Sequence, residues 1–162
     1  MTLPPLVNYE SVDEYRNHYV EAYCRNSILT YDGIRVFFSA KQFVHTFYES
    51  SARDGRKDVF SRVRAQRINW IKFTLTSPHA SLFVGWDKGS RAYDSTRRVA
   101  VVFEDFVVVV AMRLRPDGTL KANFVTCYQA DNSITKIRRS PVWSKEDCIR
   151  QLRKSTNNEK GR

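Results

Sequence analysis

The sequence has little cysteine and histidine, and neither residue occurs in pairs. Its three cysteines, Cys24, Cys127 and Cys148, lie far apart, and its three histidines are equally scattered. Disulfide frameworks and zinc sites use several such residues at short, repeated spacings. We therefore expect neither of them, and we expect chemistry that uses no metal ion and no small-molecule cofactor.

Long apolar runs and a signal peptide are also missing. No segment approaches the roughly 20 apolar residues of a membrane span. The start, MTLPPLVNYES, lacks a basic stretch followed by an apolar one. These absences predict a cytoplasmic protein with no membrane partner.

Acidic residues are scarce relative to basic ones. The chain has 17 Asp and Glu against 27 Lys and Arg, which gives a formal net charge of +10. Such an excess of positive charge attracts polyanions. Nucleic acid is the leading ligand class, ahead of an anionic membrane surface or an acidic inhibitor protein.

The length and composition are those of one globular domain. The chain has 162 residues, and 42% of them are hydrophobic, enough to bury a core. Pro4 and Pro5 predict an extended arm over residues 1–10, so the domain itself covers residues 11–150. The basic, polar segment 151–162 predicts a disordered tail.

A first helix is predicted over residues 11–25. Ser11 and Glu14 form a capping-box pattern, in which each side chain bonds a free backbone group at the helix start. Three tyrosines then share one face of the helix, and they form either a packing surface or a platform that stacks nucleobases. They are Tyr15, Tyr19 and Tyr23.

Residues 39–75 predict two more helices joined by a polar loop over residues 50–58. The first helix starts with a second capping-box pattern, Ser39 and Gln42. Its phenylalanines point toward the core and His45 points the opposite way. The loop carries three cations that are either solvated or in contact with phosphate groups. They are Arg53, Arg56 and Lys57.

The second of these helices, over residues 58–75, has two arginines within its apolar stripe. Arg64 and Arg67 fall on the same face as Phe60 and Ile71. A charge on a buried face is costly unless it is paired or reaches water. Either both guanidinium groups reach water at the edge of the stripe, or the stripe ends in a cleft that binds phosphate.

From residue 81 the pattern changes to β-branched and aromatic runs separated by turn residues. Short connections, including a tight turn at Glu104 and Asp105, require an antiparallel meander. The run 107–110 has no polar residue, which predicts a central strand covered on both faces. We therefore predict an α+β fold, with N-terminal helices packed on one face of a four-stranded antiparallel sheet. The predicted strands are 81–87, 97–104, 105–114 and 120–129.

The last predicted strand carries two polar side chains, Thr126 and Tyr128, that are two residues apart and so should lie on the same face. Because side chains alternate along a strand, Phe124, Thr126 and Tyr128 should share a face, and Val125 and Cys127 should share the other. Thr126 and Tyr128 either line a cleft beneath the helices or are simply good strand formers.

Five short segments follow one another in a helix, helix, sheet succession. They are HTFYES (45–50), RAQRINWI (64–71), RRVAVV (97–102), VVVV (107–110) and FVTCY (124–128). Together they resemble the phage and prophage-borne branch of the barnase, EndoU, colicin and RelE-like (BECR) nuclease fold, over about residues 34–139. Members of this fold class are metal-independent RNases, often deployed as toxins against competing or infected cells.

The resemblance implies roles for particular residues. His45 corresponds to the histidine after the family's first strand, Arg67 to the arginine of its RAxRIxWI helix, and Thr126 and Tyr128 to its FxTxY strand. Cys127 stands where the family pattern TAY has alanine, and it is expected to point away from the cleft. The resemblance and the charge also imply a bacterial or phage-encoded toxin with RNA as substrate and an acidic antitoxin or immunity protein as partner.

These residue types suit RNA cleavage by the 2′-hydroxyl, which leaves a 2′,3′-cyclic phosphate. The reaction needs a base of near-neutral pKa, a proton donor for the leaving 5′-oxygen, and fixed positive charge at the phosphorus. His45 has the pKa of the base, and either Tyr128 or Thr126 donates to the phosphate or to the leaving oxygen. The sequence leaves open whether His45 and Tyr128 exchange the roles of base and acid. Arg67 supplies the charge, seconded by Arg64 or Arg98.

Three questions stay open at this stage. Glu49, one turn beyond His45, either orients the imidazole or is a surface carboxylate. A non-enzymatic module that binds RNA or DNA would also explain the charge and the aromatic residues. A phage or prophage protein with an inactive nuclease fold is a further alternative to the nuclease.

Overall fold

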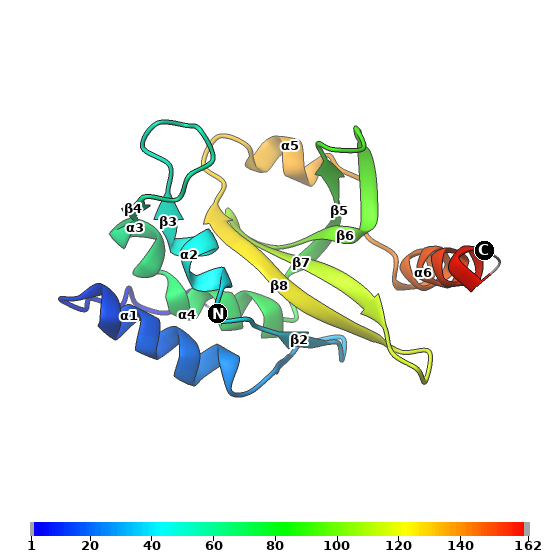
Figure 1. Cartoon of the computed structure of the whole chain (residues 1–162), viewed down its shortest axis with the longest axis horizontal. Coiled ribbons are helices and arrows are strands. Elements are labelled where there is room, and N and C mark those ends of the chain that lie inside the picture. Colours follow the sequence, from blue (N-terminus) through cyan, green and yellow to red (C-terminus); the bar gives the residue numbers. More distant parts are fainter. Residues whose placement is uncertain (1, 161–162) are drawn as a thin grey trace.

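The computed structural model describes residues 2–160 and has an α+β fold built on one curved sheet (Figure 1). Four long strands form the predicted antiparallel meander, each paired with the next along the chain. The prediction of this meander is confirmed. The strands are β5 (Ser81–Asp87), β6 (Ala92–Phe103), β7 (Phe106–Leu114) and β8 (Leu120–Gln129).

The sheet is larger than predicted and it is mixed. Two short strands, β1 (Ile28–Leu29) and β2 (Arg35–Phe37), extend it beyond β8, so that the strand order is β1-β2-β8-β7-β6-β5. β2 pairs in parallel with residues 121–123 of β8. The prediction of a four-stranded antiparallel sheet was therefore wrong. β2 has only three residues and its partner β8 lies more than 80 residues further along the chain, so no local pattern shows that β2 joins the sheet.

The central position of β7 is confirmed. Val107, Val108, Val109 and Val110 are all buried, and they alternate between two separate apolar cores. The larger core is covered by helices α1 (Val12–Tyr19), α2 (Gln42–Phe47), α4 (Ile68–Thr76) and α6 (Lys145–Lys160).

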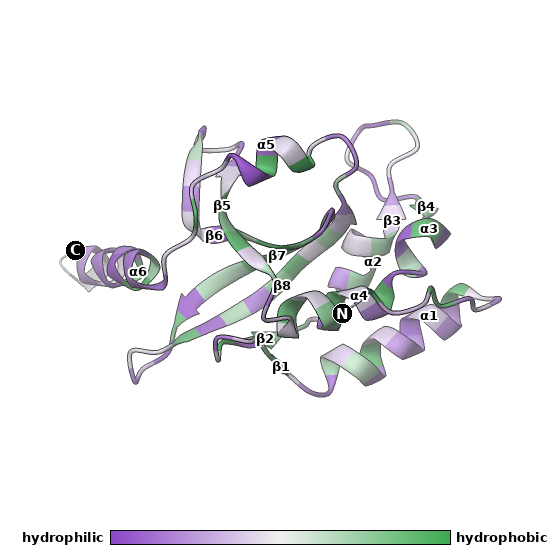
Figure 2. Cartoon of the chain, turned by 180° about the vertical axis from the view of Figure 1, so that it is seen from behind, coloured by the Kyte–Doolittle hydropathy of each residue, from purple (hydrophilic) through white to green (hydrophobic). Residues whose placement is uncertain are grey.

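The opposite face of the sheet is also covered by a helix. Helix α5 (Ile134–Arg138) lies over that face, where Ile134 and Ile137 pack against the smaller core (Figure 2). The N-terminal helices lie on one face, but the predicted layout left out α5, because residues after the meander carry the chain back across the sheet.

The first helix is capped by Ser11 as predicted, but the Glu14 carboxylate accepts from the Ser11 hydroxyl rather than from a backbone N–H. The Ser11 hydroxyl accepts a hydrogen bond from the Glu14 backbone N–H at 3.3 Å, and a π-helical turn, η1 (Val20–Cys24), follows α1. Its three tyrosines are buried, and each hydroxyl donates to a backbone carbonyl. The acceptors for Tyr15, Tyr19 and Tyr23 are Val7, Ser39 and Ile68, at 2.8, 2.7 and 2.6 Å. These tyrosines are therefore packing residues and do not stack nucleobases.

Both terminal segments of the described chain contact this body. The arm at residues 2–10 has no helix or strand, but Pro4 accepts a hydrogen bond from the Trp70 indole at 2.7 Å. The predicted tail is helical as far as Lys160, and residues 161–162 lie outside the described part. Ile149 and Leu152, one turn apart in α6, pack against the larger core. The segment is polar on average, so its composition alone did not predict this apolar contact.

Candidate functional site

Helix α2, which carries His45, lies along the part of β8 that β2 leaves unpaired (Figure 1). The Gln42 side chain holds it there by donating to the backbone carbonyls of Phe124 and Val125, at 3.3 and 2.8 Å. The predicted capping box was wrong, because Gln42 is used in this contact and the helix starts without a side-chain cap.

The two carbonyls bound by Gln42 belong to a β-bulge in β8. Val109 pairs with Thr126 and Val110 with Phe124, so Val125 is an extra residue. Phe124 consequently packs in the larger core, on the same face as Cys127. The prediction that Phe124 shares a face with Thr126 and Tyr128 was wrong.

Thr126 and Tyr128 face the other side of the sheet, the one that carries α5. They pair with Val109 and Val107, both of which belong to the smaller core. Cys127 is buried on the face covered by α1, α2 and α4, and Thr126 and Tyr128 face away from these helices. The predictions that Thr126 and Tyr128 line a cleft beneath the helices and that Cys127 points away from the helices were therefore wrong.

His45 projects from the exposed side of α2, while Phe43 and Phe47 are fully buried, as predicted. Partial burial lowers the pKa of the His45 imidazole, and the positive charges of Lys57, Arg98 and Arg64 lower it further. An imidazole with a lowered pKa is neutral at pH 7 and is able to accept a proton.

Tyr128 has the opposite electrostatic bias. Burial raises the pKa of its phenol, and the Arg98 guanidinium offsets only part of this effect. The phenol is therefore protonated at neutral pH and is a donor. The positive charge of Arg98 lowers the pKa of His45 and that of Tyr128.

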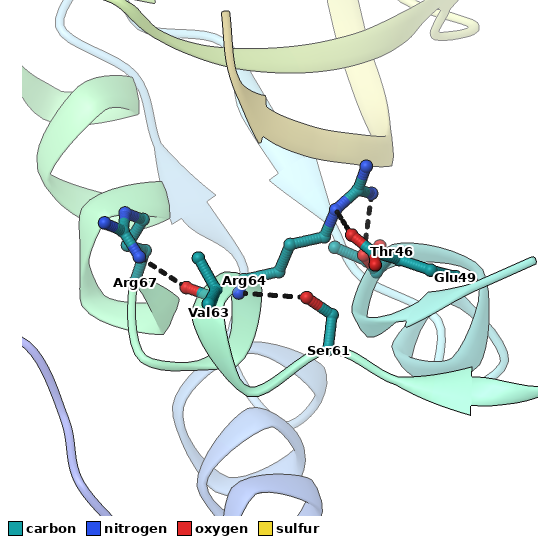
Figure 3. Close-up of polar contacts among 6 residues, drawn as sticks. All are labelled: Thr46, Glu49, Ser61, Val63, Arg64 and Arg67. Carbon is teal, nitrogen blue, oxygen red and sulfur yellow. Dashed lines mark hydrogen bonds and ion pairs between the residues drawn. The ribbon is translucent and has the colours of Figure 1, made fainter. Parts of the chain in front are cut away.

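Arg64 is positioned by α2 and by the strand that follows it, β3 (Tyr48–Glu49). Its Nε lies 3.2 Å from a Glu49 carboxylate oxygen, and one terminal nitrogen donates to the Thr46 carbonyl at 3.4 Å (Figure 3). Glu49 thus pairs with Arg64 rather than with the His45 imidazole.

The predicted helix over residues 58–75 is broken, and the break separates the two arginines. It consists of β4 (Val59–Phe60), α3 (Arg62–Ala65) and α4, with Arg67 at φ −96° and ψ 18° between the helices. The free Gln66 carbonyl accepts a hydrogen bond from the Val7 N–H of the arm at 2.8 Å. The prediction of one uninterrupted helix was therefore wrong, because a hydrogen bond from the distant N-terminal arm stabilises the break.

Arg67 turns back along its own chain, away from Arg64 (Figure 3). It donates to the Val63 carbonyl at 2.5 Å, and its guanidinium lies 5.0 Å from the centre of the Trp70 ring. It lines a cavity of about 30 Å³ against the end of β8. That volume suits about one water molecule and no phosphate. Arg67 is also not among the described cations that lower the pKa of His45.

The predicted basic loop connects β3 and β4, which pair with each other. Its carboxylates are bound within the loop: Asp54 accepts from the Arg56 N–H at 3.0 Å, and Asp58 accepts from the Ser51 N–H at 2.9 Å. Arg53, Arg56 and Lys57 are exposed. The loop therefore presents positive charge to solvent next to His45.

Arg98 owes its place to an irregularity that sequence reasoning missed. Val84 of β5 pairs with Val99, but the next residue, Gly85, pairs with Asp94, so residues 95–98 of β6 bulge out. A Cβ at Gly85 would lie 2.4 Å from the Arg98 carbonyl oxygen. Only glycine at position 85 allows the Arg98 backbone to come this close. A glycine inside a strand pattern was the sequence signal that could have predicted the bulge.

We expect Gly85→Ala to lower the free energy of unfolding by about 1–3 kcal/mol, the usual cost of overpacking, and to displace Arg98. Gly89→Ala is the matched control, since its nearest atoms would lie 3.8 Å away. Urea unfolding of both variants measures the difference. Equal stability of the two variants would contradict this account of the bulge.

Arg98 and Tyr128 also line an open cleft of about 650 Å³ between α5 and the β5–β6 hairpin. The sequence analysis missed four other residues that line this cleft, because they meet only through the β5–β6 pairing and the position of α5. They are Trp86, Lys88, Tyr93 and Lys136.

Comparisons add no relative to this description. The chain matches no protein family, curated protein or solved structure with which it was compared. Among the residues described, no helix has the length and apolar content needed to cross a membrane. The described part of the chain also gathers no group of three or more His, Cys, Asp or Glu side chains suited to a metal ion.

Proposed function

We propose that the protein is a metal-independent endoribonuclease that cleaves RNA by attack of the 2′-hydroxyl on the adjacent phosphate. The observation that carries this proposal is His45, an exposed imidazole of α2 whose pKa is lowered by partial burial and by the charges of Lys57, Arg98 and Arg64. A neutral base among fixed cations suits a reaction whose substrate is a phosphate and whose transition state gains negative charge.

The electrostatics favour one order of the two proton transfers. His45, neutral at pH 7, takes the proton of the 2′-hydroxyl, whose oxygen then bonds to phosphorus. The bond from phosphorus to the 5′-oxygen breaks, and Tyr128, protonated by virtue of its raised pKa, donates to that oxygen. The products are a 2′,3′-cyclic phosphate and a free 5′-hydroxyl.

The remaining predicted residues take supporting roles in this proposal. Arg98 and Arg64 stabilise the charge on the non-bridging oxygens, and Thr126 donates to the phosphate from the same face as Tyr128. Arg67, which is bound to Val63 and Trp70, positions α3 and α4. A toxin role with an acidic neutralising protein fits the same basic surface.

Incubation of the purified protein with RNA in the presence of EDTA tests the proposal. We expect fragments that end in 2′,3′-cyclic phosphate, and no cleavage of DNA or 2′-O-methyl RNA, which lack the nucleophile. RNA that is bound but remains intact would instead favour a nucleic-acid-binding module or an inactive nuclease fold.

The basic loop should set the salt dependence of RNA binding. Removing one cation that contacts a phosphate of single-stranded RNA should reduce the slope of log affinity against log salt by about 0.7. We therefore expect a shallower slope when Arg53, Arg56 and Lys57 are replaced by glutamine. The matched control removes three exposed cations elsewhere, Arg113, Arg153 and Lys154. Equal slopes for the two triple variants would remove the loop from the RNA-binding surface.

A further inference from the structure

The cleft beside Arg98 and Tyr128 contains an aromatic pair that the proposed chemistry does not use. Trp86 of β5 and Tyr93 of β6 are cross-strand partners, with ring centroids 5.2 Å apart and ring planes at 83°. Trp86 is still 50% exposed and Tyr93 is 48% exposed. Their mutual contact therefore uses only part of their surface, and both residues line the cleft.

The other polar groups of the cleft are cations and hydroxyls. Lys88, Arg98 and Lys136 line it, and no carboxylate side chain is among its lining residues. Ser133 and Ser140 add hydroxyl groups at the two ends of α5. Exposed aromatic rings among cations are the combination that binds single-stranded nucleic acid, since rings stack on bases and cations contact phosphates.

The size and position of the cleft suit a nucleotide next to the cleaved bond. Its volume of about 650 Å³ is within the range of small-ligand sites. Arg98 and Tyr128 line this cleft, and the charge of Arg98 also lowers the pKa of His45. An RNA strand with its reacting phosphate at His45 and Arg98 would thus place a neighbouring nucleotide in the cleft.

We infer that Trp86 and Tyr93 form a subsite that stacks a nucleobase adjacent to the cleaved bond, and that the substrate is single-stranded RNA; this rests on the proposed ribonuclease function. Stacking on a side chain requires an unpaired base, because neighbours cover both faces of a base in a duplex. The subsite recognises a π face rather than a hydrogen-bonding pattern, so it accepts several bases.

Binding of a short 2′-O-methyl RNA, which cannot be cleaved, tests the subsite separately from catalysis. We expect Trp86→Ala to weaken binding by about 5- to 150-fold, the usual loss for one stacked base. Trp86→Phe should retain most of the affinity because it keeps a ring. Tyr31→Ala is the control, since Tyr31 is 70% exposed and lies outside this cleft.

An abasic strand of the same length supplies the second comparison, and it should bind Trp86→Ala and the parent protein equally. RNA should also quench the tryptophan fluorescence of the parent protein more than that of Trp86→Phe, a readout that does not depend on the alanine variant folding. Parent-like affinity of Trp86→Ala for 2′-O-methyl RNA, or tighter binding of duplex than of single strand, would overturn the subsite even if RNA is cleaved. A loss of binding in Trp86→Ala without any cleavage by the parent would support base stacking on Trp86, but it would remove the nuclease proposal and the place of the subsite next to a cleaved bond.

Discussion

Replacing His45 with alanine is expected to lower the rate of RNA cleavage by about two to four orders of magnitude, the usual contribution of a positioned general base. RNA affinity should stay close to that of the parent, because a neutral imidazole adds little to phosphate binding. Single-turnover cleavage and equilibrium binding to 2′-O-methyl RNA separate the two quantities.

His79→Ala is the matched control, since His79 is also exposed and lies outside the site. It should cleave RNA at the parental rate. Parental rates in both His45→Ala and Tyr128→Phe would eliminate the nuclease proposal and leave the RNA-binding module.

The same assignment predicts the pH dependence. The pKa of His45 lies below its ordinary value of 6.5 because of partial burial and then Lys57, Arg98 and Arg64. A base works only when deprotonated, so kcat/KM should be level near pH 7 and should fall as the pH drops through this lowered pKa. A midpoint above 6.5 for the free enzyme would contradict the assignment of His45 as the base.

Replacing Arg98 with alanine is expected to have the second largest effect, a loss of about 10²- to 10³-fold in kcat, as for removal of one oxyanion donor. It should also move the acidic midpoint of kcat/KM to higher pH, because the loss of a nearby positive charge makes the His45 imidazolium easier to form. Steady-state kinetics over a pH series measures both effects.

Two variants make the Arg98 result specific. Arg98→Lys should largely restore the midpoint, since it restores the charge, but only part of the rate, since an ammonium cannot make the bidentate contact of a guanidinium. Arg113→Ala removes a positive charge from the far end of the sheet and should change neither quantity. A midpoint that stays unchanged in Arg98→Ala would separate Arg98 from His45.

Local pattern was sufficient wherever neighbours in sequence are also neighbours in space. The meander from β5 to β8 follows from strand periodicity and short turns, and the capped start of α1 follows from Ser11 and Glu14. The exposure of His45 opposite Phe43 and Phe47 follows from helical geometry. The basic loop beside His45 follows from composition and from the length of one connection.

The arrangement of the candidate site was decided by tertiary contacts. The bulge in β8 turns Phe124 away from Thr126 and Tyr128, and it is bound by Gln42, which is 82 residues from Phe124. The break before α4 is completed by the Val7 N–H from the arm. The local sequence around the bulge and around the break does not show that Gln42 and Val7 will bind there. The local patterns therefore predicted a regular strand and a regular helix.

The sequence by itself determined the charge, the four long strands and the residue types from which a site is made. Only the tertiary structure decided which of them meet. The positive charge of Arg98 lowers the pKa of both His45 and Tyr128, and Arg67 is bound to Val63 instead. Trp86 pairs with Tyr93 just beyond the bulge that Gly85 permits. The physical reason is that periodicity reports which side chains prefer burial, whereas register shifts and helix breaks depend on hydrogen bonds to segments far along the chain.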